Sequence, residues 1–206
     1  MAYRKTPAEI RRLEAAREHL VARATEVVAE VGWAHASVTA VADAAGIAAG
    51  SVYQHFPSKA ALAVEVFRRA AGREVDVLSD VLKGSGDPVE RLADGVQVFA
   101  RRALENRGLA HALLVSPAEP AVGAERLDFR LRYRTLFAEV IHEGMRDGLL
   151  PPQNGEVTAA ALTGAIGEVL VAPLGTPEED GTVELLEELT AMALRCAGAA
   201  PAAPRP

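Results

Sequence analysis

The sequence predicts an all-α protein with two domains and about nine helices. Apolar residues recur at helical intervals along most of the chain, no segment shows the alternation of a β-strand, and Gly and Pro separate the periodic segments. The chain has 206 residues, of which 50% are hydrophobic but only 4% are aromatic. The core must therefore consist mainly of Ala, Val and Leu, which favours closely packed helices.

The first helix is expected from Pro7 to Gly32. Thr6-Pro7-Ala8-Glu9 combines a capping box with a proline at the first helical position. Apolar residues then share one face until the glycine, which is suited to ending the helix. Trp33 follows directly, and we expect it to fill the core of a small N-terminal domain.

Residues 37–59 have the spacing of a helix-turn-helix. A short helix over 38–45 would be capped by Ser37, and Gly46 can end it with a positive φ. The Ser37 hydroxyl could serve the cap, a phosphate of DNA, or both. A recognition helix is expected over 48–55, because the proline after it disfavours helical geometry at the preceding residue.

Residues 45–59, AGIAAGSVYQHFPSK, resemble the DNA-binding segment of the tetracycline-repressor (TetR) family, commonly AG-V-S-x-G-T-L-Y-x-H-F-x-S-K. The resemblance implies a helix-turn-helix DNA-binding domain over 1–57. It assigns phosphate contacts to Ser37, Tyr53, His55 and Lys59, places Ala49, Gly50, Ser51 and Gln54 nearest the base edges, and adds Thr39 to the DNA-binding set. Polar residues are usual where this chain has Ala48 and Ala49, so we expect little direct base readout.

Each of these residues, taken singly, also has a plainer interpretation. Tyr53 and Phe56 could be core aromatics, His55 a surface residue, and Lys59 a solvated charge in the first turn of a helix. The agreement of the spacing, the turn glycine and the Tyr-x-His-Phe-Pro-Ser-Lys run favours the DNA-binding interpretation over these alternatives.

The net charge of −6 is divided unevenly along the chain. Residues 1–60 hold seven Lys and Arg against six Asp and Glu, whereas the remainder holds fifteen against twenty-two. The N-terminal domain is thus relatively basic, which favours proximity to phosphates. Arg4 and Lys5 could form a basic arm that reaches DNA, or a disordered terminus.

The sequence predicts a cytoplasmic protein that is not an enzyme. No apolar run is expected to reach the roughly 18 to 20 residues of a membrane span, and the N-terminus does not resemble a signal peptide. Cys196, the single cysteine, is expected to be a small buried hydrophobe. The five histidines lack metal-ligand spacing and no Gly-rich loop follows a strand, so no metal, cofactor or catalytic residue is expected.

The C-terminal region, 58–198, is expected to be a ligand-binding and dimerisation domain, followed by a disordered tail at 199–206. Helices are expected over about 58–83, 88–106, 109–115, 124–147, 156–173 and 178–197, with a loop at 117–123. Residues 137–150 and 159–174 also resemble the C-terminal half of TetR-family proteins. The resemblance implies a homodimer joined by the last two helices of each subunit, with Gly164 and Gly167 permitting close approach. The same apolar faces could instead form an internal core.

The resemblance further implies a small-molecule effector that binds inside this domain and releases a dimeric repressor from a palindromic operator. Recognition helices must be spaced at about one DNA turn, roughly 34 Å, so a small rotation can remove the register. Aromatic and isolated polar side chains are possible pocket residues. They are Phe67, Phe99, His111, Leu114, Phe129, Tyr133, Phe137 and Glu168. The alternative function is a helical protein-interaction adaptor, or a small-molecule-binding protein without DNA activity.

Overall fold

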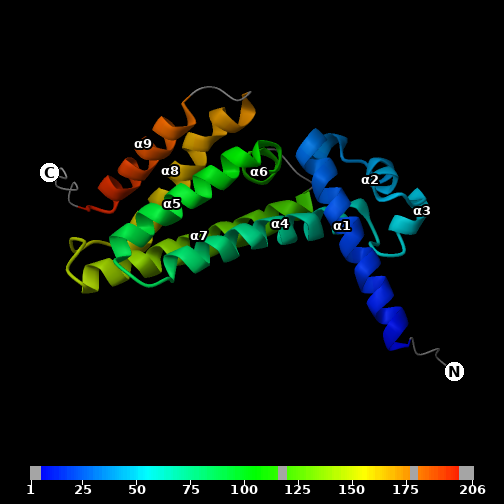
Figure 1. The fold of residues 1–206 in the computed structure, drawn as a ribbon, viewed down its shortest axis with the longest axis horizontal. Helices are drawn as coiled ribbons and strands as arrows, with labels where there is room; N and C mark the ends of the chain where they lie inside the picture. The colour runs from blue at the N-terminus through cyan, green and yellow to red at the C-terminus, as the bar shows by residue number, and fades with distance from the viewer. Residues whose placement is uncertain (1–5, 116–119, 177–180, 200–206) are drawn as a thin grey trace.

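The computed structural model describes residues 6–115, 120–176 and 181–199, and the regular structure of this part of the chain is entirely helical. The helices are α1 (Pro7–His35), α2 (Val38–Ala45), α3 (Ala49–Val52), α4 (Lys59–Leu82), α5 (Pro88–Glu105), α6 (Arg107–Leu114), α7 (Pro120–Arg146), α8 (Gly155–Gly175) and α9 (Thr182–Cys196). Figure 1 shows an elongated molecule with α1, α2 and α3 at one end, here called the head, and α4 to α9 forming the larger body. The all-α prediction is confirmed.

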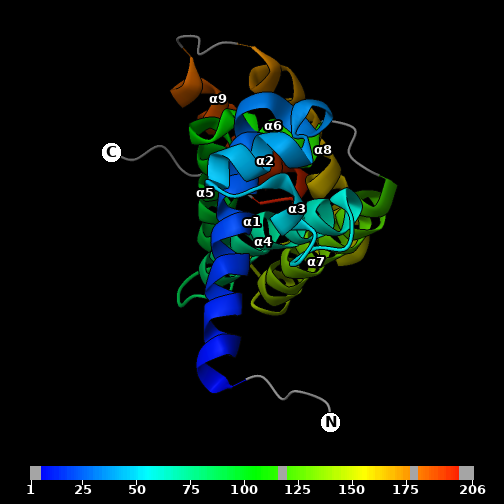
Figure 2. The same cartoon turned by 90° about the vertical axis from the view of Figure 1, so that its right-hand side faces the viewer.

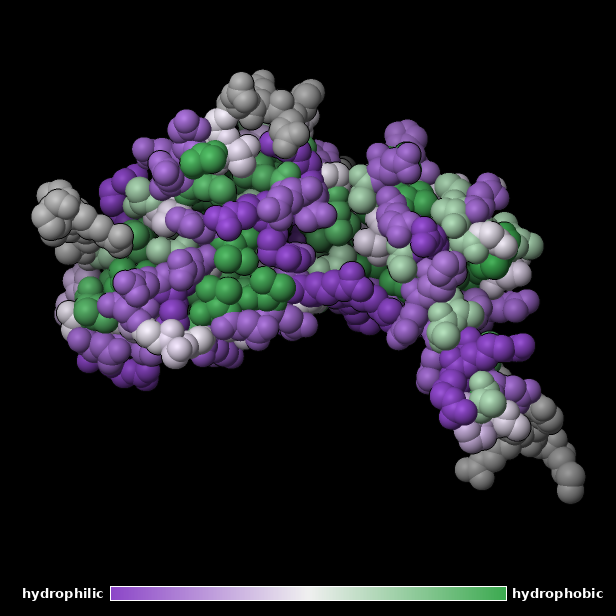
Figure 3. Space-filling view, viewed as in Figure 1, coloured by the Kyte–Doolittle hydropathy of each residue, from purple (hydrophilic) through white to green (hydrophobic). Residues whose placement is uncertain are grey.

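The start of α1 has the predicted capping box. The Glu9 amide donates to the Thr6 hydroxyl over 3.3 Å, and the Thr6 amide donates to the Glu9 carboxylate over 2.8 Å. The N-terminal part of α1 projects away from the rest of the molecule (Figures 1 and 2) and its surface is mostly hydrophilic (Figure 3). Gly32 interrupts the regular helix with a φ of 70°. The predicted end of the helix therefore coincides with a kink, and one further turn carries Trp33 into the core.

The helix-turn-helix forms with its predicted caps. The Ser37 hydroxyl accepts from the Ala40 amide over 3.1 Å, and Gly46 ends α2 with a φ of 68°. A Cβ at Gly46 would meet nothing within 4 Å, so the backbone conformation, and not space, requires glycine there. Val52 and Phe56 are buried as expected.

The recognition helix is shorter than predicted. Only Ala49–Val52 is α-helical, and the expected last turn consists of tighter bonds, from Gln54 to Ser51 and from His55 to the Val52 carbonyl. Ala48 has no side chain that can cap the helix. The proline after Phe56 also prevents continuation. Both ends of the helix are thus weakly supported by hydrogen bonds.

Helix α4 joins the head to the body. Its N-cap is Ser58, whose hydroxyl accepts from the Ala61 amide over 3.1 Å. An ion pair between Arg17 and Glu65, 3.0 Å long, ties α1 to α4. The pKa of Glu65 is lowered, chiefly because its carboxylate accepts a hydrogen bond from Arg17. The ion pair therefore holds the first turns of α4 against α1 of the head.

The body is built around α5, which packs against α4, α7, α8 and α9. Leu92, Val96 and Ala100 on α5 are completely buried. Helix α7 begins at Pro120, so part of the loop expected at 117–123 is helical, because proline is well suited to a first helical position. The tail expected at 199–206, apart from its first residue, lies outside the described residues, as do 116–119 and 177–180.

Two sequence predictions about α8 and α9 are wrong. Cys196 is exposed, because the face of α9 that points inward there carries Ala193 and Ala197. Helix α8 is long and apolar enough, by length and composition alone, to cross a membrane, with a mean hydropathy of 1.7 over its most apolar window. Only 28% of that window is buried within the chain. An apolar helix thus lies on the surface of the body.

Candidate DNA-binding face and ligand cavity

The exposed side of the helix-turn-helix carries the residues predicted to contact DNA. Tyr53 is 54% exposed, whereas Phe56 is only 2% exposed. The core interpretation is thus right for Phe56 and wrong for Tyr53. Thr39, Gly50 and Gln54 are also exposed, while Ser37 is exposed and engaged as a cap. The partly buried members of the predicted set are Ala49, Ser51, His55 and Lys59.

Phe56 fixes the position of this face. It is buried directly beneath Arg17 of α1, whose guanidinium carbon lies 4.7 Å from the centre of the ring. Val52 is buried beside the same core. With these two side chains turned inward, the intervening Tyr53 and Gln54 are turned outward. The arrangement presents two hydrogen-bonding side chains on a short, anchored turn.

The head has no excess of positive charge among the described residues. Residues 6–60 hold five Lys and Arg against six Asp and Glu. The positive balance predicted for the N-terminal domain therefore depends on Arg4 and Lys5, which lie outside the described residues. Binding of DNA by this face must therefore depend on the positions of individual hydrogen-bond donors more than on a general positive potential.

The head meets the body at α6. The Trp33 indole N–H donates to the Ala112 carbonyl over 2.8 Å, and this bond is buried. Gly108 of α6 faces the backbone of Ala29 in α1, so closely that a Cβ on the glycine would lie 2.0 Å from the Ala29 carbonyl oxygen. Only glycine permits the two backbones to approach so closely. Helices α1 and α6 are therefore in direct backbone contact.

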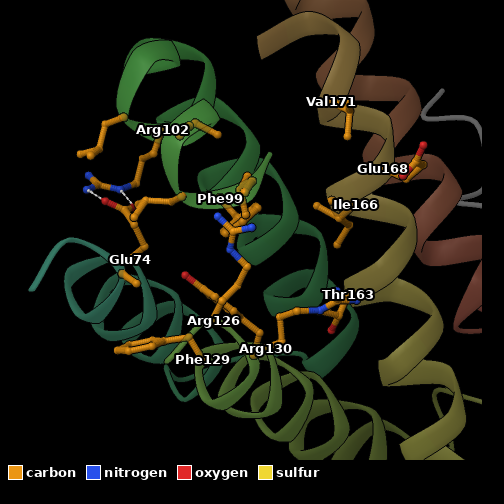
Figure 4. A pocket seen from close by; sticks show the side chains of 18 of the residues that line it. Glu74, Phe99, Arg102, Arg126, Phe129, Arg130, Thr163, Ile166, Glu168 and Val171 are labelled. Atoms are coloured by element: carbon orange, nitrogen blue, oxygen red, sulfur yellow. Dashed lines mark hydrogen bonds and ion pairs between the residues drawn. The ribbon is translucent and has the colours of Figure 1, made fainter. Parts of the chain in front are cut away.

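On its other side α6 lines a cavity of about 230 Å³ inside the body. Figure 4 shows side chains of α4, α5, α7 and α8 that also surround it. Two edge-to-face aromatic pairs shape its wall, Phe67 with Phe129 at 5.7 Å and Phe99 with Tyr133 at 5.4 Å between ring centres. The apolar lining is completed by Ala71, Ala103, Leu109, Ala110, Leu113, Leu114, Phe137, Ile166 and Val171.

The cavity also has a charged side. Glu74 and Arg102 form a two-bond ion pair with distances of 2.7 and 2.8 Å, which raises the pKa of the guanidinium. Arg126 donates to the Ala112 carbonyl over 3.3 Å. Burial, and next the charge of Arg130, lower the Arg126 pKa. Burial followed by the charge of Glu74 raises the pKa of Tyr133, so its hydroxyl stays protonated and can donate.

Family models match both parts of the chain. Residues 20–66 match the model described as bacterial regulatory proteins, tetR family, and residues 85–170 match the model described as tetracyclin repressor-like, C-terminal domain. The chain belongs to the TetR family. The first match covers the helix-turn-helix and the start of α4, and the second covers most of the body.

Two curated relatives of this TetR-family protein are named as transcriptional repressors. The HTH-type transcriptional repressor KstR2 of Mycolicibacterium smegmatis is 27% identical over 140 residues, which are 66% of this chain and 68% of the relative. The repressor DhaR of Mycobacterium sp. strain GP1 is 27% identical over 158 residues, 73% of this chain and 80% of the relative.

Solved structures show the same fold. Transcriptional regulator FadR of Bacillus subtilis, in complex with stearoyl-CoA, has a TM-score of 0.75 and 18% identity, with 85% of this chain and 96% of that chain covered. A transcriptional regulator from Rhodococcus sp. Rha1 has a TM-score of 0.73 and 24% identity, with 90% and 99% covered. The fold is thus shared with proteins whose sequences are less than 25% identical to this chain.

Most of the predicted pocket residues of this TetR-family chain do line the cavity. They are Phe67, Phe99, Leu114, Phe129, Tyr133, Phe137 and Glu168. His111 is not among the lining residues, although it lies on α6. Gly164 and Gly167 line the cavity too, and a Cβ on either would meet nothing within 4 Å in the chain. Within the chain these glycines leave space beside the cavity. The close approach predicted for them concerns a second subunit and stays a prediction.

Sequence reasoning missed the charged lining residues Glu74, Arg102, Arg126 and Arg130. A signal was present on α7, where the two arginines are four residues apart and share a helix face with Phe129 and Tyr133. Charges among aromatic residues on one face are unlike an ordinary solvated surface. Among the described residues, no group of three or more His, Cys, Asp or Glu could hold a metal ion.

Proposed function

We propose that this TetR-family regulator is a cytoplasmic homodimeric repressor that binds a palindromic operator and is released by a small molecule in the cavity of the body. The observation that carries the proposal is the connection between the two candidate sites. One helix, α6, lines the cavity and contacts α1 of the head. A ligand that binds one arrangement of α6 more tightly than another can therefore change the position of the DNA-binding face.

Each predicted DNA contact follows from the chemistry of its side chain. Tyr53, His55 and Lys59 supply hydrogen-bond donors to phosphates, together with Ser37 and Thr39. Gln54 can bond bidentately to adenine in the major groove. The small residues Ala49, Gly50 and Ser51 allow the short recognition helix to approach the base edges. We place the boundary between the DNA-binding domain and the ligand-binding domain between residues 57 and 58, just before α4 begins at Lys59.

The dimer is proposed from the surface of α8 and α9. Leu162, Ile166 and Leu170 of α8 are buried in the body and belong to its own core. The opposite side of α8 exposes Val157, which is 64% exposed, and α9 exposes Val183 to a similar degree. Further apolar residues of α8 on the surface are Ala161, Val169 and Ala172. A second copy of the chain would cover this surface, because exposed apolar patches commonly mark interfaces between proteins.

The small-molecule part of the proposal rests on the cavity and on the fold match. Bacillus subtilis FadR has this fold, and its structure is a complex with stearoyl-CoA. Here the cavity has an apolar lining with a few polar groups, as ligand sites commonly do. The curated relatives are named as repressors, so loss of DNA binding on ligand binding is the proposed direction.

Selection of bound fragments from genomic DNA tests the central proposal. We expect a palindromic sequence bound in a salt-sensitive manner, with two chains per site by sedimentation. Lys59→Ala should weaken binding to all sequences and lower the slope of log affinity against log salt by about one unit, as loss of a phosphate contact does. Arg101→Ala, on the exposed surface of α5, is the matched control. Failure to select any duplex would overturn the proposal and favour an adaptor or a purely ligand-binding protein.

A further inference from the structure

Most polar groups that line the cavity are already engaged within the chain. Glu74 and Arg102 satisfy each other through two hydrogen bonds of 2.7 and 2.8 Å (Figure 4). Arg126 donates to the Ala112 carbonyl over 3.3 Å, and the side-chain amide of Asn106 donates to the Arg102 carbonyl over 3.2 Å. The charged and amide groups of this part of the wall therefore have partners of their own.

The other charged lining residues lie at the surface. Arg130 of α7 and Glu168 of α8 line the cavity but are exposed to solvent. A charged group of a ligand inside the cavity would lose its hydration, and the charges that it would meet there are already paired or hydrogen-bonded. The remaining wall is mainly aromatic or aliphatic. The interior of the cavity is therefore suited to a ligand without a formal charge.

Tyr133 differs from these lining residues, because its polar group is not used by the chain. The ring is partly buried in the cavity wall, and its hydroxyl makes no hydrogen bond with any residue that the structure describes. The Thr163 hydroxyl, which also lines the cavity, donates instead to the Ala159 carbonyl of its own helix over 2.8 Å. Burial raises the pKa of Tyr133, so its hydroxyl stays a neutral donor. A ligand oxygen is the partner that this donor lacks.

The packing of the aromatic wall fixes where this donor lies. The Tyr133 ring, on α7, meets the Phe99 ring of α5 edge to face, with 5.4 Å between the ring centres and an angle of 76° between the planes. Phe67 and Phe129 form the second such pair of the wall, at 5.7 Å. Packed rings have little freedom to turn, so the hydroxyl is held in position before a ligand arrives.

We propose that the cavity binds a compact, uncharged and mainly apolar molecule, and that the Tyr133 hydroxyl donates a hydrogen bond to a carbonyl oxygen of this ligand. The inference rests on the proposed function, because it takes the cavity as the effector site, and it adds the chemical class of the effector. The cavity volume of about 230 Å³ is below the roughly 300 to 1,000 Å³ of common ligand sites, so the ligand is compact. The aromatic and aliphatic lining supplies its apolar contacts.

Three naphthalene derivatives of nearly equal shape test this ligand class. In 2-acetylnaphthalene, 2-isopropylnaphthalene and 2-naphthoate the substituent has the same number of non-hydrogen atoms but is, respectively, a ketone, a hydrocarbon and an anion. Each is titrated into the full-length protein, and binding is measured by calorimetry. We expect the ketone to bind more tightly than the hydrocarbon, and ten-fold or more tightly than the carboxylate, which must lose its hydration.

Tyr133→Phe tests the assigned donor. The variant keeps the ring against Phe99 and removes only the hydroxyl. Binding of 2-acetylnaphthalene should weaken about three- to ten-fold, as loss of one neutral hydrogen bond predicts. Binding of 2-isopropylnaphthalene should be unchanged, which also verifies that the cavity of the variant is intact.

Thr135→Val is the matched control for the loss of a hydroxyl. Thr135 lies two residues further along α7, is exposed, and is not among the lining residues; its hydroxyl donates to the Leu131 carbonyl over 3.0 Å. This variant should bind all three compounds as the unmodified protein does.

Four results would overturn the inference. The uncharged ligand class is wrong if 2-naphthoate binds as tightly as the ketone, and the compact aromatic or aliphatic ligand is wrong if none of the three compounds binds. The carbonyl is not recognised if the hydrocarbon binds as tightly as the ketone. The role of Tyr133 is wrong if Tyr133→Phe binds the ketone as the unmodified protein does.

The inference and the proposed function fail in different ways. If the protein binds selected DNA but only a charged compound releases it, the regulator function stands and the uncharged ligand class is wrong. If the ketone binds in a manner that depends on Tyr133 but no duplex is selected, the ligand class stands and the repressor function is wrong.

Discussion

The head and the body use their aromatic residues in opposite ways. In the head, Trp33 and Phe56 are buried in the core, whereas Tyr53 is exposed to solvent. In the body, paired aromatic rings line a space and do not fill it. A filled core holds a surface in one conformation, whereas a lined cavity can accommodate a ligand by small movements of its walls. The two parts are thus built for recognition by a fixed surface and for ligand binding, respectively.

The largest expected effect comes from emptying the core of the head. Phe56→Ala should destabilise the head by about 3 to 5 kcal/mol, because it leaves a cavity beneath Arg17. DNA binding should be lost while binding at the cavity of the body persists. Circular dichroism during heating measures the loss of stability, a gel-shift assay with selected DNA measures DNA binding, and calorimetry with a compound that binds the cavity measures ligand binding.

Tyr53→Ala is the matched control for that change. It removes an aromatic ring three residues away, but from an exposed position. We expect a stability change within about 0.5 kcal/mol together with weaker DNA binding. If the two variants were equally destabilised, the division between an anchoring and an exposed aromatic residue would be wrong.

The next largest effect is expected where the two parts touch. Gly108→Ala would place a Cβ 2.0 Å from the Ala29 carbonyl oxygen, so α6 and α1 would have to separate. Overpacking of this kind costs about 1 to 3 kcal/mol. Gly72→Ala, in α4 with nothing within 4 Å of the new Cβ, should instead stabilise the protein by up to about 1 kcal/mol. Denaturant unfolding of both variants gives the comparison, and a neutral Gly108→Ala would show that the contact can relax.

A smaller and more specific effect is expected from Gln54→Ala. Loss of one bidentate base contact should change the preference at one base pair in each half-site by about 1 to 3 kcal/mol and leave folding unchanged. Selection of bound DNA with the variant measures this preference. Gln97→Ala, a glutamine of α5, should give the unmodified pattern. An unaltered profile for Gln54→Ala would remove this residue from base readout.

The smallest effect concerns the ion pair between head and body. The pKa of Glu65 is lowered from its usual value near 4.5 chiefly by Arg17, so ionised Glu65 favours the folded state. This contribution is fully present above that pH and is lost as the pH falls through the lowered pKa. The difference in melting temperature between the unmodified protein and Glu65→Gln should therefore shrink as the pH is lowered from neutral through and below the usual carboxyl pKa near 4.5.

The head could be predicted from the sequence in unusual detail because its signals are local. The Thr6 capping box, the Ser37 and Ser58 caps and the positive φ of Gly46 each depend on a few adjacent residues. The length of the recognition helix was overestimated. Its ends depend on how the backbone N–H and C=O groups near Ala48 and before Pro57 are hydrogen-bonded. The spacing of apolar residues along the sequence does not give this information.

The cavity could be predicted only in part, because its wall comes from helices far apart in the sequence. Aromatic residues were correctly placed along it, since few positions in the body carry large rings. Arg126 and Arg130 were missed, because a charged residue on a helix is ordinarily solvated. Cys196 was assigned to the core for its residue type, but the rotation of α9 against α5 decides which face is buried. That rotation depends on packing over the whole body.

The contact of Gly108 with Ala29 has a mechanical consequence. Side chains between two helices normally absorb small displacements by changing rotamer, but here backbone meets backbone and nothing compliant lies between. Helix α6 has no clearance in the direction of α1. It can slide along α1 or carry α1 with it, but it cannot move toward it independently. A displacement of α6 in that direction is therefore delivered to α1 almost undiminished.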